Sequence, residues 1–184
     1  MKHLAFLIGE GEKSSSSFFG LSAGETVKKI TLLSQEAFRS GFDQASFLFY
    51  GYFGEFPPFS NEIPVYLRVL KDGEIPPSRQ TPVVNLGLNF SEKEFLAGIL
   101  RKHPDFSFSE AEIKNYMQNL GWIEPDLVII TGGIRSIGDS LTWSIAYSEL
   151  FFSPVCWRDF SLEELDRAFQ DFSKRERRFG KINE

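Results

Sequence analysis

The sequence predicts an α/β fold: a single domain over residues 1–184, with a mostly parallel central sheet of about six strands flanked by helices. Two observations predict this fold class. Short apolar runs alternate along the chain with segments of helical periodicity, as in βα units. The runs are continuously apolar, which is typical of strands that helices cover on both faces of a parallel sheet. The length of 184 residues suffices for one full hydrophobic core.

The apolar runs are the expected strands. They are residues 4–8, 45–50, 65–70, 83–88 and 127–131, with a weaker run near 151–156. Two further segments, residues 57–64 and 71–82, are rich in proline and leave no room for a helix. Parallel neighbours need a crossover of about a dozen residues. These links therefore leave three arrangements open: local antiparallel pairing, pairing of strands distant in sequence, or loops at a sheet edge.

The expected helix starts share the pattern Ser-x-x-Glu. It occurs at Ser22, Ser91, Ser109 and Ser161, each time before a segment with helical apolar spacing. The serine hydroxyl accepts a hydrogen bond from an otherwise unpaired amide, and the glutamate three residues later reaches back to the cap. We therefore expect a helix to begin after each of these serines.

Composition and charge exclude several classes of protein. The net charge of −5 argues against broad electrostatic binding of nucleic acid, and the one basic cluster, residues 174–178 in the last expected helix, is too short to change this. Cys156 is the single cysteine, which excludes an intramolecular disulfide and a thiolate zinc site. The apolar run at 4–8 is too short for a signal peptide or a membrane span. We expect a cytoplasmic protein that visits a membrane surface at most.

The most specific pattern lies in the C-terminal third, in four segments: Asp-Leu-Val-Ile-Ile-Thr-Gly-Gly (126–133), Trp-Ser-Ile-Ala-Tyr-Ser-Glu-Leu-Phe-Phe (143–152), Ser-Pro-Val-Cys-Trp-Arg-Asp-Phe (153–160) and Arg-Glu-Arg-Arg-Phe-Gly (175–180). They resemble, in order and without a gap, the active-site strand, the following helix, the next segment and the ending of the cis-prenyltransferase (undecaprenyl diphosphate synthase-like) family. Residues 3–8, 65–70 and 85–90 resemble its first, third and fourth strands.

The resemblance implies a reaction as well as a fold. Family members condense an allylic prenyl diphosphate with isopentenyl diphosphate in cis geometry. Mg²⁺ and an aspartate of the first strand assist the departing diphosphate, arginines clamp both diphosphates, and an apolar tunnel holds the growing chain. An allylic cation forms only where the leaving diphosphate charge is neutralised by metal, arginine or directed amides.

Several positions depart from the family pattern. Gly9 stands where the family has its aspartate, and Ile130 and Ile134 stand where it has an arginine and a glutamate. Isoleucine cannot form a bidentate fork to phosphate. Helices that wall the family's tunnel are missing between the second and fourth strands, so this chain alone should make no long-chain product. The diphosphate-binding candidates that remain are Gly9, Gly11, Lys13, Arg135, Arg178 and Gly180.

The metal candidates are three carboxylates, with Mg²⁺ as the expected ion if the chain binds one. Glu149 survives in the family's Tyr-x-Glu setting, where the carboxylate contributes to magnesium binding, and Glu10 or Glu12 could replace the missing aspartate. The other interpretation of Glu149 is a structural one, as part of a hydrogen-bond network. The candidates for lining a pocket are Asn85, Asn89 and Tyr147.

Three functions stay open. The leading hypothesis is a catalytically impaired family member that forms a homodimer, or a heterodimer with an intact cis-prenyltransferase, through its C-terminal half. Retention of Arg178-Phe179-Gly180 favours it, because a tail of this type completes the partner's site in two-subunit members. The second is an active short-chain or branching prenyltransferase with isoprenyl diphosphate ligands. The third is a small-ligand binding protein with an aromatic pocket, formed by Phe47, Phe49, Tyr50, Tyr52 and Phe53. Whether the chain is an enzyme is left open, and no catalytic residue is assigned.

Overall fold

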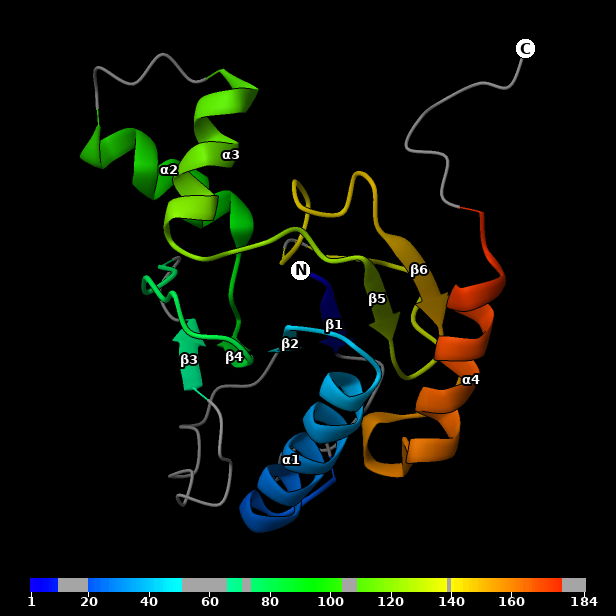
Figure 1. The fold of residues 1–184 in the computed structure, drawn as a ribbon. Helices are drawn as coiled ribbons and strands as arrows, with labels where there is room; N and C mark the ends of the chain where they lie inside the picture. The colour runs from blue at the N-terminus through cyan, green and yellow to red at the C-terminus, as the bar shows by residue number, and fades with distance from the viewer. Residues whose placement is uncertain (10–19, 51–65, 71–73, 104–108, 139, 177–184) are drawn as a thin grey trace.

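The computed structural model describes residues 1–9, 20–50, 66–70, 74–103, 109–138 and 140–176. These residues contain six strands: β1 (His3–Ile8), β2 (Gln44–Phe49), β3 (Tyr66–Leu70), β4 (Val83–Leu88), β5 (Leu127–Ile130) and β6 (Glu149–Phe152). They also contain four α-helices, α1 (Ala23–Arg39), α2 (Glu92–Lys102), α3 (Glu110–Asn119) and α4 (Leu162–Lys174), and a short 3-10 helix at Trp157–Asp159 (Figure 1). The expected strands and helix starts are confirmed.

The six strands form one sheet in the order β3-β4-β2-β1-β5-β6. All five strand pairings in the described sheet are parallel, so the antiparallel arrangement that the short links left open is wrong. β3 lies at one edge of the sheet, and β2 pairs with β4 rather than with the next strand in sequence. The link at 71–82 is about as short as a parallel crossover allows.

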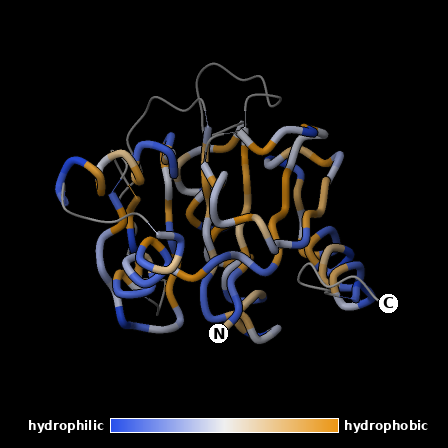
Figure 2. Tube along the Cα trace, turned by 90° about the horizontal axis from the view of Figure 1, so that it is seen from above, coloured by the Kyte–Doolittle hydropathy of each residue, from blue (hydrophilic) through white to orange (hydrophobic). Residues whose placement is uncertain are grey.

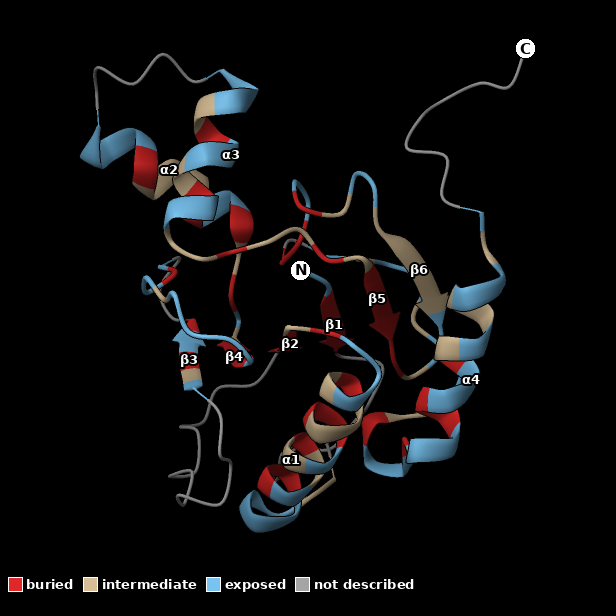
Figure 3. Ribbon diagram, viewed as in Figure 1, coloured by how far each residue is buried: buried red, intermediate tan, exposed pale blue. Residues whose placement is uncertain are grey.

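Helices cover both faces of the sheet (Figure 1). On one face, α1 and α4 pack on Leu4, Phe6 and Ile8, and on the other, α2 and α3 pack on Ala5 and Leu7. Period-2 alternation along each strand sends successive side chains to opposite faces, and both faces are apolar. Figure 2 shows the hydrophobic segments gathered along the strands, with hydrophilic segments toward the outside, and Figure 3 shows the central strands buried. The chain therefore holds two hydrophobic clusters, one on each side of the sheet.

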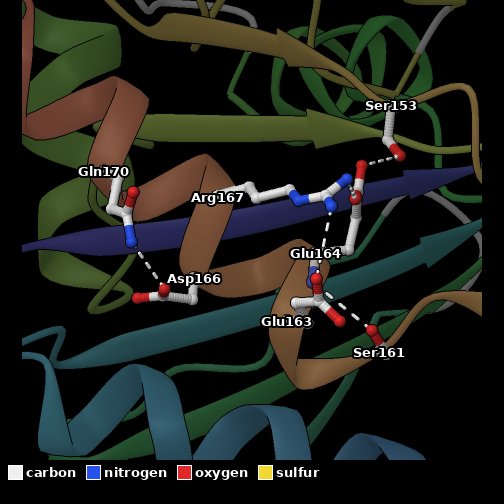
Figure 4. Close-up of polar contacts among 7 residues, drawn as sticks. All are labelled: Ser153, Ser161, Glu163, Glu164, Asp166, Arg167 and Gln170. Carbon is white, nitrogen blue, oxygen red and sulfur yellow. Dashed lines mark hydrogen bonds and ion pairs between the residues drawn. The ribbon is translucent and has the colours of Figure 1, made fainter.

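The four helix caps form only in part as expected. At Ser22 and Ser109 the capping box is complete, with glutamates 25 and 112 reaching back to the cap. At Ser91 and Ser161 the serine accepts the amide hydrogen bond without a returning glutamate. In α4 the carboxylate of Glu164 is buried and instead accepts a hydrogen bond from Ser153 Oγ at 2.7 Å (Figure 4). A side chain expected to close a cap thus ties α4 to the end of β6.

Two expectations about the C-terminal third are wrong. Residues 140–147 form consecutive turns rather than a helix, and β6 begins at Glu149 rather than near residue 151. The buried carboxylate of Glu92 accepts hydrogen bonds from the amides of Trp143 and Ser144 and from Ser144 Oγ. These amides are satisfied by a side chain from α2, which a local sequence pattern cannot reveal. α4 ends at Lys174 with Arg175 as its C-cap, so the described part of the basic cluster lies at the end of this helix.

No helix among the described residues is long and apolar enough to cross a membrane.

Candidate functional site

The fold itself points to one edge of the sheet. Because all strands run parallel, their carboxyl ends lie together, and the strand order reverses between β1 and β5. Open α/β sheets bind ligands in the crevice outside the carboxyl ends of the strands at such a reversal. Gly9 follows β1 at this point, and Thr131-Gly132-Gly133-Ile134 follows β5. We call this region the carboxyl edge.

The centre of the carboxyl edge is apolar. Gly9 is buried, and a Cβ atom placed on it would lie 3.2 Å from Ile134 Cδ1 and 3.8 Å from Tyr50 Cβ. Ile134 and Tyr50 are both partly buried and pack against the hydrophobic cluster under α2 and α3. Ile130, in the position of a family arginine, is a fully buried member of the same cluster. Methyl groups and a ring therefore occupy the end of β1.

The turn after β5 uses its amides within the protein. Gly132 and Gly133 have positive φ angles of 77° and 69°, a conformation that glycine adopts without steric cost. The amide of Gly132 donates to Val155 O and that of Gly133 donates to Ser153 O, both at 2.9 Å. These bonds continue the pairing of β5 with the segment after β6. The two amides are consequently engaged and do not point at a ligand.

Two of the predicted site residues lie on this edge at its surface. Arg135 is exposed on the loop after β5, one residue from Ile134. Asn89 is exposed after β4, has a φ of 48°, and donates its amide to Phe49 O at 2.8 Å. With Gly9, they are the predicted site residues that the structure brings to the carboxyl edge.

Asn85 lies deeper, in a row of polar side chains across four strands. Its Nδ2 donates to Ser46 Oγ at 2.9 Å, and its Oδ1 accepts from Arg68 Nε at 2.7 Å. His3 Nε2 lies 2.6 Å from the same Ser46 hydroxyl. All four residues are at most 1% exposed. We call His3, Ser46, Asn85 and Arg68 the buried polar row.

Trp122 covers the buried polar row. The Arg68 guanidinium lies 5.7 Å from the Trp122 ring centroid, and the His3 ring meets it edge-on at 5.2 Å. Burial lowers the pKa of His3 to about 4 and that of Arg68 to about 10. Arg68 also donates to Leu120 O at 2.9 Å. The row joins the sheet to the segment after α3, and the polar residues at matching strand positions were the signal that could have revealed it from the sequence.

Glu149 lies at the other end of the sheet. It is the first residue of β6, paired in register with Leu127 at the start of β5. Its carboxylate accepts from Arg175 at 2.9 Å, and Arg175 also pairs with Asp171 at 2.5 Å. Within one chain, Glu149 and Gly9 therefore stand at opposite edges of the sheet. The contacts of Glu149 within the chain are those of a structural network with Arg175 and Asp171.

Tyr147 lies two residues before Glu149, at the end of the sheet where the strands begin. We call this end the amino edge. Its side chain is 52% exposed and lines a cavity of about 430 Å³ together with Met1, Trp122 and Asp126. Asn85, Asn89 and Tyr147 thus do not line one common pocket: they lie within the sheet, at its carboxyl edge and at its amino edge.

Six predicted site residues, Glu10, Gly11, Glu12, Lys13, Arg178 and Gly180, lie outside the described residues. Within the described part of the chain, no three His, Cys, Asp or Glu side chains come together as metal ligands. Mg²⁺ requires oxygen ligands in near-octahedral geometry, whereas the described end of β1 offers Ile134 and Tyr50. The described residues therefore do not fit a magnesium–diphosphate group.

Comparisons with known proteins agree with this architecture. A family model described as "putative undecaprenyl diphosphate synthase" matches residues 74–180. An isoprenyl transferase of Ralstonia nicotianae is 34% identical over 135 residues, covering 71% of this chain and 52% of its own. A ditrans,polycis-undecaprenyl-diphosphate synthase ((2E,6E)-farnesyl-diphosphate specific) of Wigglesworthia glossinidia brevipalpis is 42% identical over 97 residues, covering 53% of this chain and 36% of its own. The chain thus spans about half, or less, of the length of these relatives.

The fold has a counterpart among solved structures. The crystal structure of a probable undecaprenyl diphosphate synthase from Campylobacter jejuni superposes with a TM-score of 0.66 at 19% identity, and the match covers 98% of each chain. At this identity the likeness establishes the fold alone. The family model matches more than half of the chain, including the turn after β5 and β6. The chain belongs to the undecaprenyl diphosphate synthase (cis-prenyltransferase) family.

Proposed function

We propose that this chain is a catalytically impaired family member that associates through its C-terminal half, with itself or with an intact cis-prenyltransferase, and supports the intact enzyme. The observation that carries the proposal is the apolar carboxyl edge. Gly9, Ile130 and Ile134 replace three side chains that bind metal and diphosphate in the family. Ile130 and Ile134 pack in the hydrophobic cluster under α2 and α3, and Ile134 lies against Gly9. Ile130 and Ile134 cannot neutralise the charge of a leaving diphosphate, which the reaction of the family requires.

The exposed aromatic residues around β6 favour association. β6 is the outermost strand of the described sheet, so one side of its backbone carries no strand neighbour among the described residues. Trp143, Tyr147 and Phe152 are 36%, 52% and 44% exposed, respectively. Aromatic side chains are enriched at the buried centres of interfaces. An open strand edge with neighbouring aromatic groups is a surface suited to a two-fold partner.

The pairing of Arg175 with Glu149 supports a role for the tail. The ion pair, together with a bond from Arg175 to Leu150 O at 3.0 Å, holds the chain after α4 against β6. The segment that contains Arg178 and Gly180 begins three residues later. We propose that this tail leaves from the same surface that carries the exposed aromatics and reaches the partner, where Arg178 contacts a diphosphate. In this proposal Glu10, Glu12, Gly11 and Lys13 remain the candidates for any residual Mg²⁺ and diphosphate contact.

Sedimentation velocity at tens of micromolar, with and without an intact synthase, tests the association. The chain should sediment as a dimer, either with itself or with the intact enzyme. Phe152→Asp should weaken association by at least about tenfold, because a hot-spot side chain contributes more than about 1.4 kcal/mol. Leu100→Asp is the matched control, since Leu100 is 48% exposed on α2 and its replacement should leave association unchanged. A monomer under both conditions would contradict the proposal.

The two other hypotheses differ in their products and ligands. An active short-chain or branching enzyme would convert dimethylallyl or geranyl diphosphate with isopentenyl diphosphate and Mg²⁺ in the absence of any partner. For the binding protein, Phe47 and Phe49 of the expected aromatic pocket lie in the hydrophobic core, and the Tyr50 hydroxyl is bonded to Ile137 O. Tyr52 and Phe53 lie outside the described residues. Core packing of the described rings favours neither hypothesis over the proposal.

A further inference from the structure

The loop after β5 is held over the end of β1 by Tyr50. The Tyr50 hydroxyl donates to Ile137 O at 2.9 Å and accepts the amide of Ser140 at 2.6 Å. Ser140 Oγ in turn donates to Phe90 O at 2.6 Å, which ties the loop to the segment after β4. The residue after β2, the segment after β4 and the loop after β5 are thereby joined at the carboxyl edge.

Gly138 fits closely against the same tyrosine. Its φ is 61°, and a Cβ atom placed on it would lie 3.0 Å from the Tyr50 hydroxyl and 3.1 Å from the ring carbons. The positive φ and the lack of space both favour glycine at this position. The loop between Ile134 and Ser140 is therefore packed on Tyr50 by contact as well as by hydrogen bonds.

Ile134 occupies the space that a side chain at position 9 would need. Gly9 does not have a positive φ, so its backbone conformation does not itself demand glycine. A Cβ atom there would lie 3.2 Å from Ile134 Cδ1 and 3.8 Å from Tyr50 Cβ, so a side chain at this position would require Ile134 to shift. A carboxylate in this buried place would lose its water without gaining a charged partner among the described residues.

We propose that Ile134 is a plug that closes the crevice between β1 and β5, that Tyr50 holds it in place, and that Gly9 provides the room for it. The crevice is the place where an open α/β sheet of this strand order binds its ligand. This inference rests on the proposed function and names the residues that keep a metal–diphosphate group out. It predicts that an aspartate at position 9 does not restore binding of a metal–diphosphate group unless Ile134 is replaced as well.

A double-mutant cycle of melting temperatures tests the plug in the isolated chain. Gly9→Asp should lower the melting temperature by more in the wild type than in the Ile134→Ala background, because Ile134→Ala vacates the contested space. If Gly9→Asp does not fold, Gly9→Ala supplies the same comparison through the 3.2 Å contact. Gly24→Asp is the matched control. A Cβ atom at Gly24 meets nothing within 4 Å, so its effect should not depend on Ile134.

A ligand measurement completes the test. Adding Mg²⁺ and pyrophosphate should raise the melting temperature of the Gly9→Asp/Ile134→Ala variant and leave that of Gly9→Asp unchanged. Additive effects in the cycle, an equal rise in Gly9→Asp alone, or no rise in the double variant would overturn the inference. Neither readout depends on a partner protein, so the plug can fail while the association proposal holds, and the reverse.

Discussion

Two regions on the same face of the sheet differ sharply in what occupies them. In the amino-terminal half of the strands, the side chains of the buried polar row (His3, Ser46, Asn85 and Arg68) are buried and linked by hydrogen bonds. At the carboxyl edge, where the fold would bind its ligand, Gly9 and Ile134 form an apolar contact instead. Among the described residues, polar side chains are thus buried within the sheet, whereas apolar side chains meet at the centre of the carboxyl edge.

The comparison distinguishes polar side chains that stabilise the fold from polar side chains that serve catalysis. A buried polar group costs free energy unless it is hydrogen-bonded, so the hydrogen bonds that link the row give it a structural reason to be kept, although Arg68 Nη2 has no hydrogen-bond partner among the described residues. A catalytic group has no structural reason of this kind. The buried polar row should therefore contribute much more to the free energy of unfolding than the carboxyl edge does.

Arg68→Ala should give the largest loss of stability. It removes the donor to Asn85 Oδ1 and one of the two donors to Leu120 O, which keeps the Ser78 amide, and it removes a side chain that is 1% exposed. Lost hydrogen bonds and a cavity together should lower the free energy of unfolding by about 3–5 kcal/mol, measured by urea denaturation. Arg39→Ala is the matched control, because Arg39 has a 72% exposed side chain and should change stability by less than about 0.5 kcal/mol. Similar losses in both variants would remove the distinction between the row and the surface.

The free energy of unfolding should depend on pH through the protonation of His3. Burial lowers its pKa from 6.5 in the unfolded chain to about 4 in the fold. The unfolded state therefore binds the proton first, and stability present above pH 6.5 is lost as the pH falls toward 4, by on the order of 3 kcal/mol.

Urea denaturation from pH 7 to pH 4 measures this loss. His3→Gln lacks the titrating group, so the difference between wild type and variant isolates His3 from the carboxylates. A variant with the same pH slope as the wild type between pH 6.5 and pH 4 would show that His3 does not titrate as described.

Tyr50→Phe should have a smaller effect at the carboxyl edge. It removes the hydroxyl that joins Ile137 O and the Ser140 amide, so the free energy of unfolding should fall by about 1–2 kcal/mol. Amide hydrogen exchange should become faster in the loop after β5 and stay unchanged in β4. A loss as large as that of Arg68→Ala would mean that the edge is as important to the fold as the row.

Arg135→Ala should have the smallest effect on the isolated chain. Arg135 is exposed on the loop after β5, and surface substitutions of this kind change stability by less than about 0.5 kcal/mol. If Arg135 is a diphosphate ligand, its loss should instead reduce the response of the melting temperature to pyrophosphate in the Gly9→Asp/Ile134→Ala variant. A large loss of stability in Arg135→Ala would show that Arg135 stabilises the fold and would argue against a role in diphosphate binding.

The sheet could be predicted from the sequence because each strand coincides with a short, mainly apolar run, and the α-helices because a serine cap precedes each one. The turns at 140–147 could not, since Glu92 satisfies their amides from about fifty residues away in sequence. Of the site, the replacements at positions 9, 130 and 134 were visible as departures from the family pattern. The fit of Ile134 onto Gly9 and the pairing of Glu149 with Arg175 depend on tertiary packing, which spacing along the chain does not encode.

Product formation tests the central claim most directly. Purified chain, an intact undecaprenyl diphosphate synthase and an equimolar mixture are each incubated with farnesyl diphosphate, labelled isopentenyl diphosphate and Mg²⁺, and the chain lengths of the products are measured. The chain alone should give no product of about ten or more isoprene units, because a prenyl chain of that length needs an apolar wall, and the described residues between β2 and β4 contain no helix to supply one. The mixture should give more product than the intact enzyme alone. Long-chain product from the homogeneous chain, or no gain in the mixture, would contradict the account.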